Sequence, residues 1–414
     1  MAIPKIQLPR RIVSLIFVTT ALLNGQIDLD AVRPFTGLGG PGSRALGMGQ
    51  AFTGIADDLT ALFYNPAGLA HITKREINLG FTYLTATTDV RSPGNTSTAT
   101  ITATRLGNAG VALPLPNSKL TIAIGYNQAR AFERQLEQTY PRDAASTIHE
   151  VLTEEGRIGY WSLGVGYQVS TQLALGGAFD ILAGKNVYTD NNTYYTGATV
   201  ASSDYLLVEP EYIGVGLSLG ILLAPLPPWR IGLLLRSPQW VSVSETSYDS
   251  YIGFEEERDY KIRGSYCLRV GSSLTVGPLL LSGDLAWFDY SQIRFESDLV
   301  DVIDSIEVPI DISINDTLRT QYANLPGYAA GAEFLLPMIN IKLRGGYRYD
   351  PPLYRKPFPQ VPQHTLNLGL SVVPVPQIKI DTALSLTTWE RSLDTNIEEE
   401  SGAVNITVNF VYRF

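Results

Sequence analysis

The sequence predicts an all-β protein, a 14-stranded antiparallel transmembrane β-barrel with an N-terminal hatch, or plug, in its lumen. Three observations favour this fold class: an amino-terminal export signal, repeated segments with period-two alternation, and connections that alternate between short and long. The 414 residues divide accordingly into a signal peptide at 1–25, a hatch at 26–75 and a barrel at 76–414.

The composition suits a membrane barrel but does not require one. Charged residues make up only 17% of the chain, which contains 37 glycines and 22 tyrosines. One face in lipid and aromatic girdles at the interfaces would explain these values. A soluble propeller or sandwich has the same composition, so the choice rests on the sequence patterns.

Charge and metal-binding residues exclude several classes of function. The net charge is −9 and no basic stripe collects on any segment, which argues against a nucleic-acid partner. Cys267 is the single cysteine, so no intramolecular disulfide framework forms. The three histidines, His71, His149 and His364, are far apart and have no metal-ligand spacing. We therefore expect no metal and no cofactor.

The amino terminus has the pattern of a secretory signal. Lys5, Arg10 and Arg11 precede an apolar run at 12–23, and Gly25 offers a small residue for cleavage. The run is too short to span a bilayer as a helix, and no later segment reaches about 18 continuous apolar residues. An exported, apolar chain of this kind belongs in the periplasm, outside the cell or in an outer membrane.

The segment at 39–70 differs from the rest of the chain. It is rich in Gly and Ala yet contains a compact apolar set, partly at helical spacing, as in Leu59, Leu62 and Phe63. It ends in Asn65-Pro66-Ala67-Gly68, where Pro fixes φ and Gly permits positive φ. We interpret it as the hatch.

After this segment the chain alternates with period two. The last segment is the clearest, because the apolar side chains from Val404 to Phe414 share one face while Asn405, Thr407 and Asn409 share the other. The fourteen expected strands lie near 75–89, 97–114, 118–134, 156–170, 171–188, 204–224, 229–242, 256–275, 278–296, 317–336, 339–350, 362–374, 377–390 and 402–414.

The connections between these strands alternate in length. Short turns, such as those at 114–117 and 225–228, alternate along the chain with longer polar connections, such as those at 134–155 and 297–316. Short periplasmic turns with long outer loops are typical of bacterial barrels, whereas a propeller or sandwich gives no reason for this alternation. The connection at 134–155 has the spacing of a short amphipathic helix. The acidic connection at 297–316 is either a solvated loop or a cation site.

Period two also assigns faces within each strand. At 260–270 it places Tyr260, Ile262, Tyr266, Leu268 and Val270 on one face. The other face then contains Lys261, Arg263, Ser265, Cys267 and Arg269, which we expect to line the lumen.

Taken together, these segments resemble the FadL/TodX family of outer-membrane transporters for long-chain fatty acids and other hydrophobic compounds. The resemblance rests on 43–70, on GDLAWFDYSQIRF at 283–295, on 343–371 and on the terminal Phe414. It implies a 14-stranded barrel in a Gram-negative outer membrane, with ligand capture at outer loops, a lumenal site beside the hatch and a sideways exit at a kinked strand. No residue in the sequence marks that kink. Tyr412 and Phe414 resemble the signal that barrel-assembly machinery recognises.

The resemblance also suggests site residues. Hatch and gating positions are Gly47, Gly49, Asn65, Pro66, Ala67 and Gly68. Ligand-binding candidates are the apolar Phe52, Leu62 and Phe63, with Arg263, Arg344 and Arg348 for the carboxylate of a fatty acid. In the alternative, the charges only hold the hatch to the wall, and both readings stay open.

The function expected from the sequence is passive uptake of hydrophobic molecules through a hatch-gated channel. The expected partners are fatty acids or similar small molecules, outer-membrane lipid and the assembly machinery. The alternative is a PorV-like protein that shares the barrel and binds secreted protein domains as a secretion component. No catalytic set stands out, since no Gly-x-Ser-x-Gly turn pairs with a placed histidine, so we expect no enzyme.

Overall fold

A computed structural model describes residues 32–35, 39–92, 95–143, 145–298, 300–303, 306–322, 324, 326–352, 362–394 and 397–414. The expected signal peptide at 1–25 and the start of the expected hatch lie outside the described residues.

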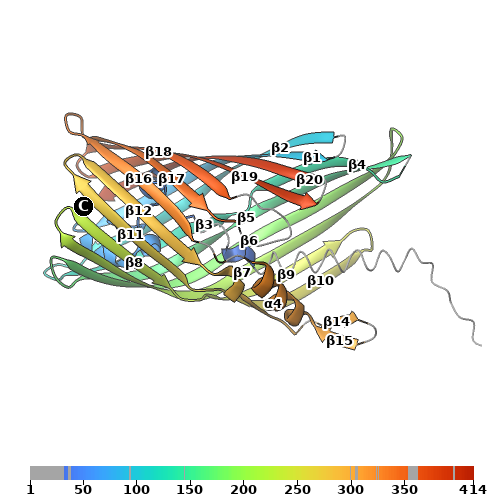
Figure 1. Cartoon of the computed structure of the whole chain (residues 1–414), viewed down its shortest axis with the longest axis horizontal. Helices are drawn as coiled ribbons and strands as arrows, with labels where there is room; N and C mark the ends of the chain where they lie inside the picture. Colours follow the sequence, from blue (N-terminus) through green and yellow to red (C-terminus); the bar gives the residue numbers. More distant parts are fainter. Residues whose placement is uncertain are drawn as a thin grey trace, which may run out of the picture.

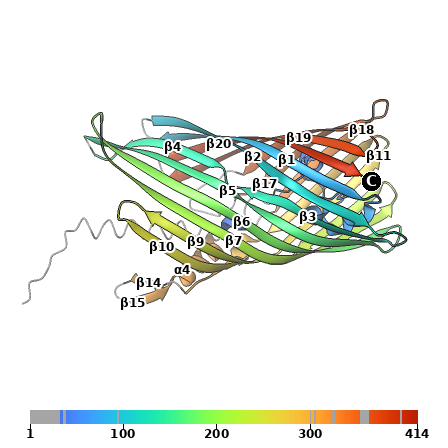
Figure 2. The same cartoon turned by 180° about the vertical axis from the view of Figure 1, so that it is seen from behind.

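One sheet of 18 strand segments curls into a closed barrel. It closes because β1 (Glu76–Ser92) pairs antiparallel with both β2 (Asn95–Pro114) and β20 (Ile397–Arg413). Figures 1 and 2 show the strands running obliquely around the long axis. Four wall strands are each interrupted into two segments, so the 18 segments make 14 wall strands. The expected 14-stranded antiparallel barrel is confirmed.

The uninterrupted wall strands are β1, β2, β5 (Ser146–Gln168), β6 (Leu173–Thr196), β7 (Thr199–Leu226), β16 (Gly327–Leu336), β17 (Ile341–Asp350), β18 (Gln363–Val375), β19 (Ile378–Asp394) and β20. The interrupted ones are β3 (Leu120–Ala131) with β4 (Arg134–Pro141), β8 (Trp229–Arg236) with β9 (Trp240–Asp249), β10 (Phe254–Arg263) with β11 (Cys267–Val276), and β12 (Leu279–Phe288) with β13 (Arg294–Glu296).

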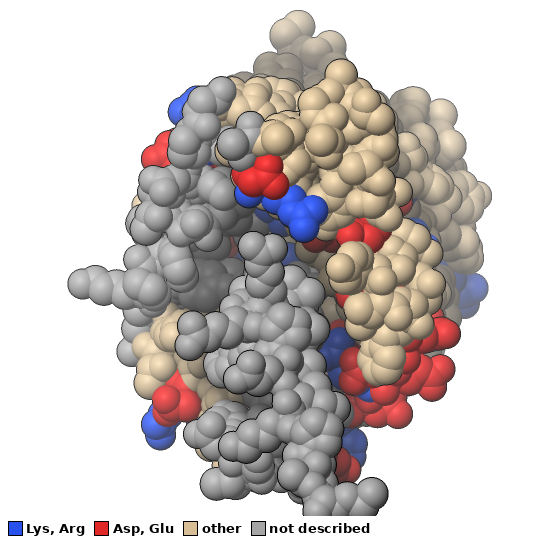
Figure 3. All heavy atoms as spheres, turned by 90° about the vertical axis from the view of Figure 1, so that its right-hand side faces the viewer, with Lys and Arg blue, Asp and Glu red and all other residues tan. Residues whose placement is uncertain are grey.

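The two ends of the barrel differ. At the short-turn end only residues 227–228 separate β7 from β8, and 277–278 separate β11 from β12. At the long-hairpin end β6 and β7 have 24 and 28 residues, far more than the roughly ten that a tilted strand needs to cross a membrane. Figure 3 looks onto this end and shows acidic side chains gathered along one side of its rim.

The expected helix at 134–155 is wrong. The chain there forms a hairpin in which β4 pairs with the first half of β5, from Arg134↔Glu154 to Pro141↔Thr147. Cross-strand pairing satisfies the backbone of this Thr- and Val-containing stretch, and it overrides a helical spacing that rested on three apolar side chains.

The outward faces of the strands are apolar, as a wall in lipid requires. Large apolar side chains are exposed in rows along several strands: Trp161, Leu163, Val165 and Tyr167; Ile213, Val215, Leu217 and Leu219; Leu366, Leu368 and Leu370; Val404, Ile406, Phe410 and Tyr412. None of the helices among the described residues combines the length and the hydropathy of a membrane-spanning helix.

Three neighbouring wall strands are interrupted at the same level, between β8 and β9, β10 and β11, and β12 and β13. Each interruption shifts which residues face the lumen. Even-numbered Leu234 and Arg236 are buried in β8, whereas odd-numbered Val241 and Val243 are buried in β9. An extra residue in one strand of a ladder has this effect, because side chains alternate with period two.

The same shift corrects the face assignment at 260–270. Tyr260 and Ile262 are buried inside the barrel, whereas Tyr266 and Val270 are exposed outside it. The error arose from reading β10 and β11 as one continuous strand. Arg263 consequently lies on the exposed outer face, so the expectation that it lines the lumen is wrong.

Short helices occupy the interior: η1 (Arg33–Phe35), α2 (Ser43–Gly47), α3 (Ala61–Tyr64) and η2 (Pro66–His71). After β12 the chain makes η3 (Tyr290–Gln292), β13, the hairpin of β14 (Val300–Ile303) and β15 (Ile306–Pro309), and then α4 (Ile310–Gln321). Helix α4 packs against β13 and η3 with Ile314 and Leu318 buried. Among the described residues, no group of three or more His, Cys, Asp or Glu side chains is placed to hold a metal ion.

Candidate functional site

The lumen is occupied by residues 39–72, which we call the lumenal segment. Its large side chains are almost fully buried, with Met48, Phe52, Leu62 and Tyr64 at 0% exposure. It touches opposite sides of the wall, since α2 contacts β17 to β20 and η2 contacts β3 and β5 to β7. The segment therefore fills the cross-section of the barrel near its short-turn end.

Glycines in the wall make room for this segment. A Cβ atom on Gly346 would lie 2.1 Å from the amide nitrogen of Gly49, and one on Gly331 would lie 2.2 Å from the carbonyl oxygen of Met48. On the opposite side, a Cβ on Gly176 would lie 2.3 Å from the amide nitrogen of Ala67. Glycine normally weakens a strand, so its use here reflects the close approach of another backbone.

Buried hydrogen bonds hold the lumenal segment to the wall. The Asp284 carboxylate accepts from the amides of Phe52 and Thr53, at 3.0 and 2.8 Å. The Asn65 side-chain amide donates to the carbonyl oxygen of Ile221 in β7 and, within the lumenal segment, to that of Thr53, both at 3.0 Å. Because each buried donor or acceptor would be costly without its partner, these contacts fix the position of the segment.

A second set of hydrogen bonds joins the segment to the seam that closes the barrel. Ser43 donates from its amide and its hydroxyl to the Asn409 side chain, at 2.9 and 2.7 Å. Asn409 in turn donates to Asn78 and Asn108, both at 2.8 Å. The network links β20, β1 and β2 to the start of α2.

Ion pairs dominate the contacts near the short-turn end. Arg44 of α2 pairs with Asp57 and with Glu333 of β16. Glu333 also pairs with Lys342 at 2.8 Å and Arg344 at 2.7 Å. Burial by itself raises the pKa of Asp57, but the attraction of Arg44 and then Arg230 outweighs it, so that pKa lies below its usual value. The Asp57 carboxylate is therefore ionised at neutral pH.

The lumen beyond the segment, toward the long-hairpin end, is apolar on one side. Buried apolar and aromatic side chains from β5 to β13 and α4 form one cluster with the lumenal segment, which we call the lumenal apolar cluster. Its members from these elements and from the β3–β4 break include Phe132, Ile158, Tyr160, Leu182, Tyr212, Val241, Val243, Tyr260, Ile262, Phe288, Ile293, Phe295, Ile314 and Leu318. Barrel interiors are ordinarily polar, so this surface needs a functional explanation.

The opposite wall is polar. Its lumen-facing, buried side chains from β1, β17, β18, β19 and β20 are largely amides, hydroxyls and charges: Asn78, Thr88, Arg344, Arg348, Asn367, Ser371, Asp381, Ser385, Thr407 and Asn409. The lumen thus has one apolar face, which suits a hydrophobic molecule, and one polar face, and the lumenal segment contacts both.

The wall contains a seam without a backbone ladder. The β2–β3 ladder runs from Pro114↔Thr121 to Asn108↔Asn127 and stops there, although both strands continue. Beyond this point β2 pairs with β1, and β3 and β4 pair with β5. Within residues 95–143 we find no backbone ladder between β2 and β4. We call this boundary the β2–β4 seam.

Side chains bridge the β2–β4 seam. Arg105 of β2 pairs with Glu133, which lies in the break between β3 and β4, and donates to the carbonyl oxygen of Gly156 at 2.9 Å. The adjacent Phe132 is buried and stacks on Tyr212 with ring centroids 6.4 Å apart. The lumenal apolar cluster therefore reaches the seam through Phe132.

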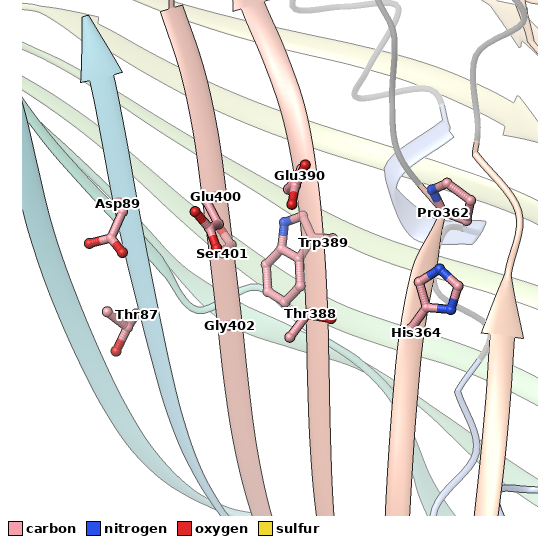
Figure 4. Close-up of a pocket in the computed structure, with 10 residues that line it drawn as sticks. All are labelled: Thr87, Asp89, Pro362, His364, Thr388, Trp389, Glu390, Glu400, Ser401 and Gly402. Carbon is pink, nitrogen blue, oxygen red and sulfur yellow. The ribbon is translucent and has the colours of Figure 1, made fainter.

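A hollow of about 290 Å³ lies where β18 begins, beside the far halves of β1, β19 and β20. It is lined by Thr87, Asp89, Pro362, His364, Thr388, Trp389, Glu390, Glu400, Ser401 and Gly402. Figure 4 shows three carboxylates and one imidazole among these side chains. That lining does not suit a hydrophobic molecule.

Comparison with known proteins now gives the family. A sequence model described as outer membrane protein transport protein (OMPP1/FadL/TodX) matches residues 41–249, half of the chain. The chain belongs to this FadL/TodX family. It is an outer-membrane protein of a transporter family rather than an enzyme family, and the resemblance inferred from the sequence is confirmed.

Solved structures of FadL/TodX proteins share the fold. The toluene transporter TodX of Pseudomonas putida superposes with a TM-score of 0.62 at 14% identity, a Pseudomonas aeruginosa FadL homologue with 0.61 at 15%, and the Ralstonia pickettii toluene transporter TbuX with 0.61 at 16%. Each match covers 91% of this chain and 99% of the other. No curated protein sequence matches the chain.

In outer-membrane barrels short turns lie in the periplasm and long hairpins lie outside the cell, which gives the orientation of this one. The expected gating residues then lie near the periplasmic mouth, where the lumenal segment packs against the wall. Gly47 and Gly49 lie beside β17 and β18. Asn65, Pro66 and Ala67 lie beside β6 and β7, and Gly68 lies against Ala56. Their role in gating stays a proposal.

The expected ligand-binding residues divide into three groups. Phe52, Leu62 and Phe63 are buried where the lumenal apolar cluster meets the segment. Arg344 and Arg348 face the lumen, but both have partners: Arg344 bonds to Glu333 and Asp381, and Arg348 to Gln50 and Asp350. Arg263 faces away from the lumen.

Two features of the site were missed in the sequence. The β2–β4 seam gave no signal except Gly156, whose φ of 149° is unfavourable for other residues. The lumenal apolar cluster gave no periodic pattern in the sequence. In the strands from β8 to β13 the lumen-facing positions change between even and odd numbers at each interruption, so the buried residues do not follow one alternation.

Proposed function

We propose that this chain carries hydrophobic small molecules, long-chain fatty acids or similar compounds, passively across the outer membrane. The supporting observation is the lumenal apolar cluster, which extends from α4 near the outer mouth to Phe63 and Tyr64 of the lumenal segment. Burial of a ligand's apolar surface there would be favourable by about 25 cal/mol per Å².

The route we propose ends in the membrane rather than in the periplasm. The lumenal segment blocks the axial path, whereas the cluster reaches the β2–β4 seam at Phe132. A hydrophobic molecule that leaves through the seam avoids the polar wall and the ion pairs below it. In this proposal residues 26–75 act as the hatch, and small movements near Asn65 and Pro66 adjust the floor of the site.

A pair of substitutions on β9 tests the proposed ligand surface. Val243 is buried in the cluster, whereas its neighbour Ser242 is exposed on the opposite face. Val243→Asn should weaken binding of a labelled long-chain fatty acid, and of toluene, by about 5- to 150-fold, since burying an unpaired amide costs about 1–3 kcal/mol. Ser242→Asn should bind as the parent does, and heat-modifiable gel mobility would show that both variants fold.

Equal binding by Val243→Asn and the parent would remove the cluster from the mechanism. Absence of saturable binding to the parent, together with co-purification of secreted proteins, would favour the alternative of a secretion component that binds protein domains at its outer hairpins.

A further inference from the structure

A pocket of about 250 Å³ opens at the periplasmic mouth, between α2 and the ends of β17 to β20. Its lining is Arg44, Asp57, Asn340, Lys342, Arg344, Ser371, Val373, Lys379 and Arg413. The strand residues among them have lumen-facing positions, so the pocket lies inside the wall and below the lumenal segment. The hydrophobic route proposed above does not use it.

The lining is strongly cationic. Five of the nine lining residues carry positive charge and one, Asp57, carries negative charge. Three further carboxylates pair with these cations from the side: Glu333, Asp381 and Glu76. The buried carboxylate of Asp58 also acts on Arg44, which brings the carboxylates in and around the pocket to five. Arg230 lies 3.9 Å from Asp57 and adds a sixth cation. Positive charge therefore exceeds negative charge in and around the pocket.

Hydrogen-bond donors also exceed acceptors. Arg344 is completely buried, and its Nη2 has no hydrogen-bond partner among the described residues. Lys342 and Lys379 each pair with one carboxylate, at 2.8 and 2.9 Å, although an ammonium group has three donors. Asn340 and Ser371 add an amide and a hydroxyl to the lining. A buried donor without a partner costs about 1–3 kcal/mol, which an incoming acceptor would recover.

These groups match the needs of a small oxyanion. A carboxylate or phosphate presents several acceptor oxygens and one or two negative charges, and Arg and Lys bind both by charge-assisted hydrogen bonds. Exposure decreases from the rim to the base, from 36% for the Lys342 side chain and 35% for Arg413 to 0% for Arg344. An anion could enter from the periplasm past the two rim cations.

We propose that this pocket is a binding site for one small oxyanion, a carboxylate or a phosphate group, at the periplasmic mouth of the barrel. The anion is held by Lys342, Lys379 and Arg413 and reaches toward the free Nη2 of Arg344. Arg44 also lines the pocket and is the residue through which α2 pairs with Glu333, so the bound anion contacts the lumenal segment directly.

Calorimetric titration of the purified, detergent-solubilised protein tests the site. Inorganic phosphate, acetate and octanoate would be titrated separately at constant ionic strength, with chloride as the balancing anion. Saturable binding of phosphate or of a carboxylate is expected. Octanoate binding tighter than acetate binding would identify the head group of an amphiphile as the source of the carboxylate, whereas phosphate binding alone would identify a phosphate.

Matched variants assign the binding to the pocket. The double variant Lys342→Gln, Lys379→Gln should bind the anion at least tenfold more weakly, whereas Lys342→Arg, Lys379→Arg should retain binding because it keeps both charges. Lys119→Gln, an exposed lysine near another periplasmic turn, should change nothing. No saturable binding to the parent protein, or equal binding by the folded glutamine variant, would overturn the proposal.

Discussion

At the scale of single residues, neighbouring glycines on β17 have opposite roles. Gly346 faces the lumen, where a Cβ would lie 2.1 Å from the amide nitrogen of Gly49. A Cβ on Gly345 would meet nothing within 4 Å. In this Gly-Gly pair, Gly346 is therefore required by a close backbone contact, whereas the position of Gly345 has room for any small residue.

This contrast gives a matched test of how tightly the lumenal segment is held. Gly346→Ala should displace residues 48–49 and weaken docking of the segment by about 1–3 kcal/mol, the usual cost of overpacking. Hydrogen exchange of the amides at 44–54 should then become faster. Gly345→Ala should leave exchange at the parent level, and equal exchange in both variants would show that the wall contact does not hold the segment.

At the scale of elements, the break between β3 and β4 adjoins a boundary of the wall that has no backbone ladder among residues 95–143. A ladder of backbone hydrogen bonds normally joins neighbouring strands of a membrane barrel, because lipid offers no alternative partners. In the β2–β4 seam, side chains take this role: Arg105 with Glu133, Asn95 with the carbonyl oxygen of Thr139, and Ser97 with that of Glu137. Side-chain contacts can separate and re-form more easily than a ladder.

Removing the charge of Glu133 should therefore loosen the seam. Glu133→Gln leaves the buried Arg105 without its carboxylate, although its bond to the carbonyl oxygen of Gly156 remains. Breaking a buried ion pair costs about 3–5 kcal/mol. We expect faster hydrogen exchange at 127–134 and faster uptake of a hydrophobic substrate.

Glu137→Gln is the control, because Glu137 lies in β4 four residues after Glu133, and its side chain is 41% exposed beside His149. It should affect neither exchange nor uptake. If Glu133→Gln leaves the exchange at 127–134 unchanged, the Arg105–Glu133 pair does not close the seam.

At the scale of the whole molecule, closure depends on the pairing of the first and last strands of the wall. β20 pairs with β1 over sixteen residue pairs, from Arg413↔Glu76 to Glu398↔Arg91. The amide of Phe414 donates to the carbonyl oxygen of Arg75 at 3.0 Å, and its ring stacks on Tyr412 with centroids 5.8 Å apart. Both rings are exposed on the outer face, so they do not pack in the interior of the barrel.

This position predicts a role for the terminal rings in assembly rather than in the folded barrel. Phe414→Ser should lower the yield of heat-modifiable protein in the outer membrane severalfold, whereas the molecules that do fold should transport as the parent does. Met338→Ser, which changes an exposed apolar residue in a periplasmic turn, is the control. A normal yield of Phe414→Ser would exclude Phe414 as an assembly signal.

Local sequence patterns were sufficient for the architecture. Period-two alternation, as in 404–414, depends only on one face of a strand contacting lipid, and the short connections depend on local turn residues such as those at 225–228. The Gly- and Ala-rich character of 39–70 likewise reflected its surroundings, because a segment packed backbone to backbone against a wall cannot have large side chains at every contact. The resemblance to the FadL/TodX family followed from the motifs at 43–70, 283–295 and 343–371, and the family model confirms it.

The tertiary structure alone decided which residues form the site. Arg263 was placed in the lumen by unbroken alternation, but the extra residues between β10 and β11 turned it outward, and such an irregularity has no periodic signature. Arg344 and Arg348 are lumenal as expected, yet only the fold shows that Glu333, Asp381 and Gln50 already occupy much of their hydrogen-bonding capacity. The β2–β4 seam is a boundary at which two segments in contact form no backbone ladder among residues 95–143, and the sequence of either strand alone does not encode it.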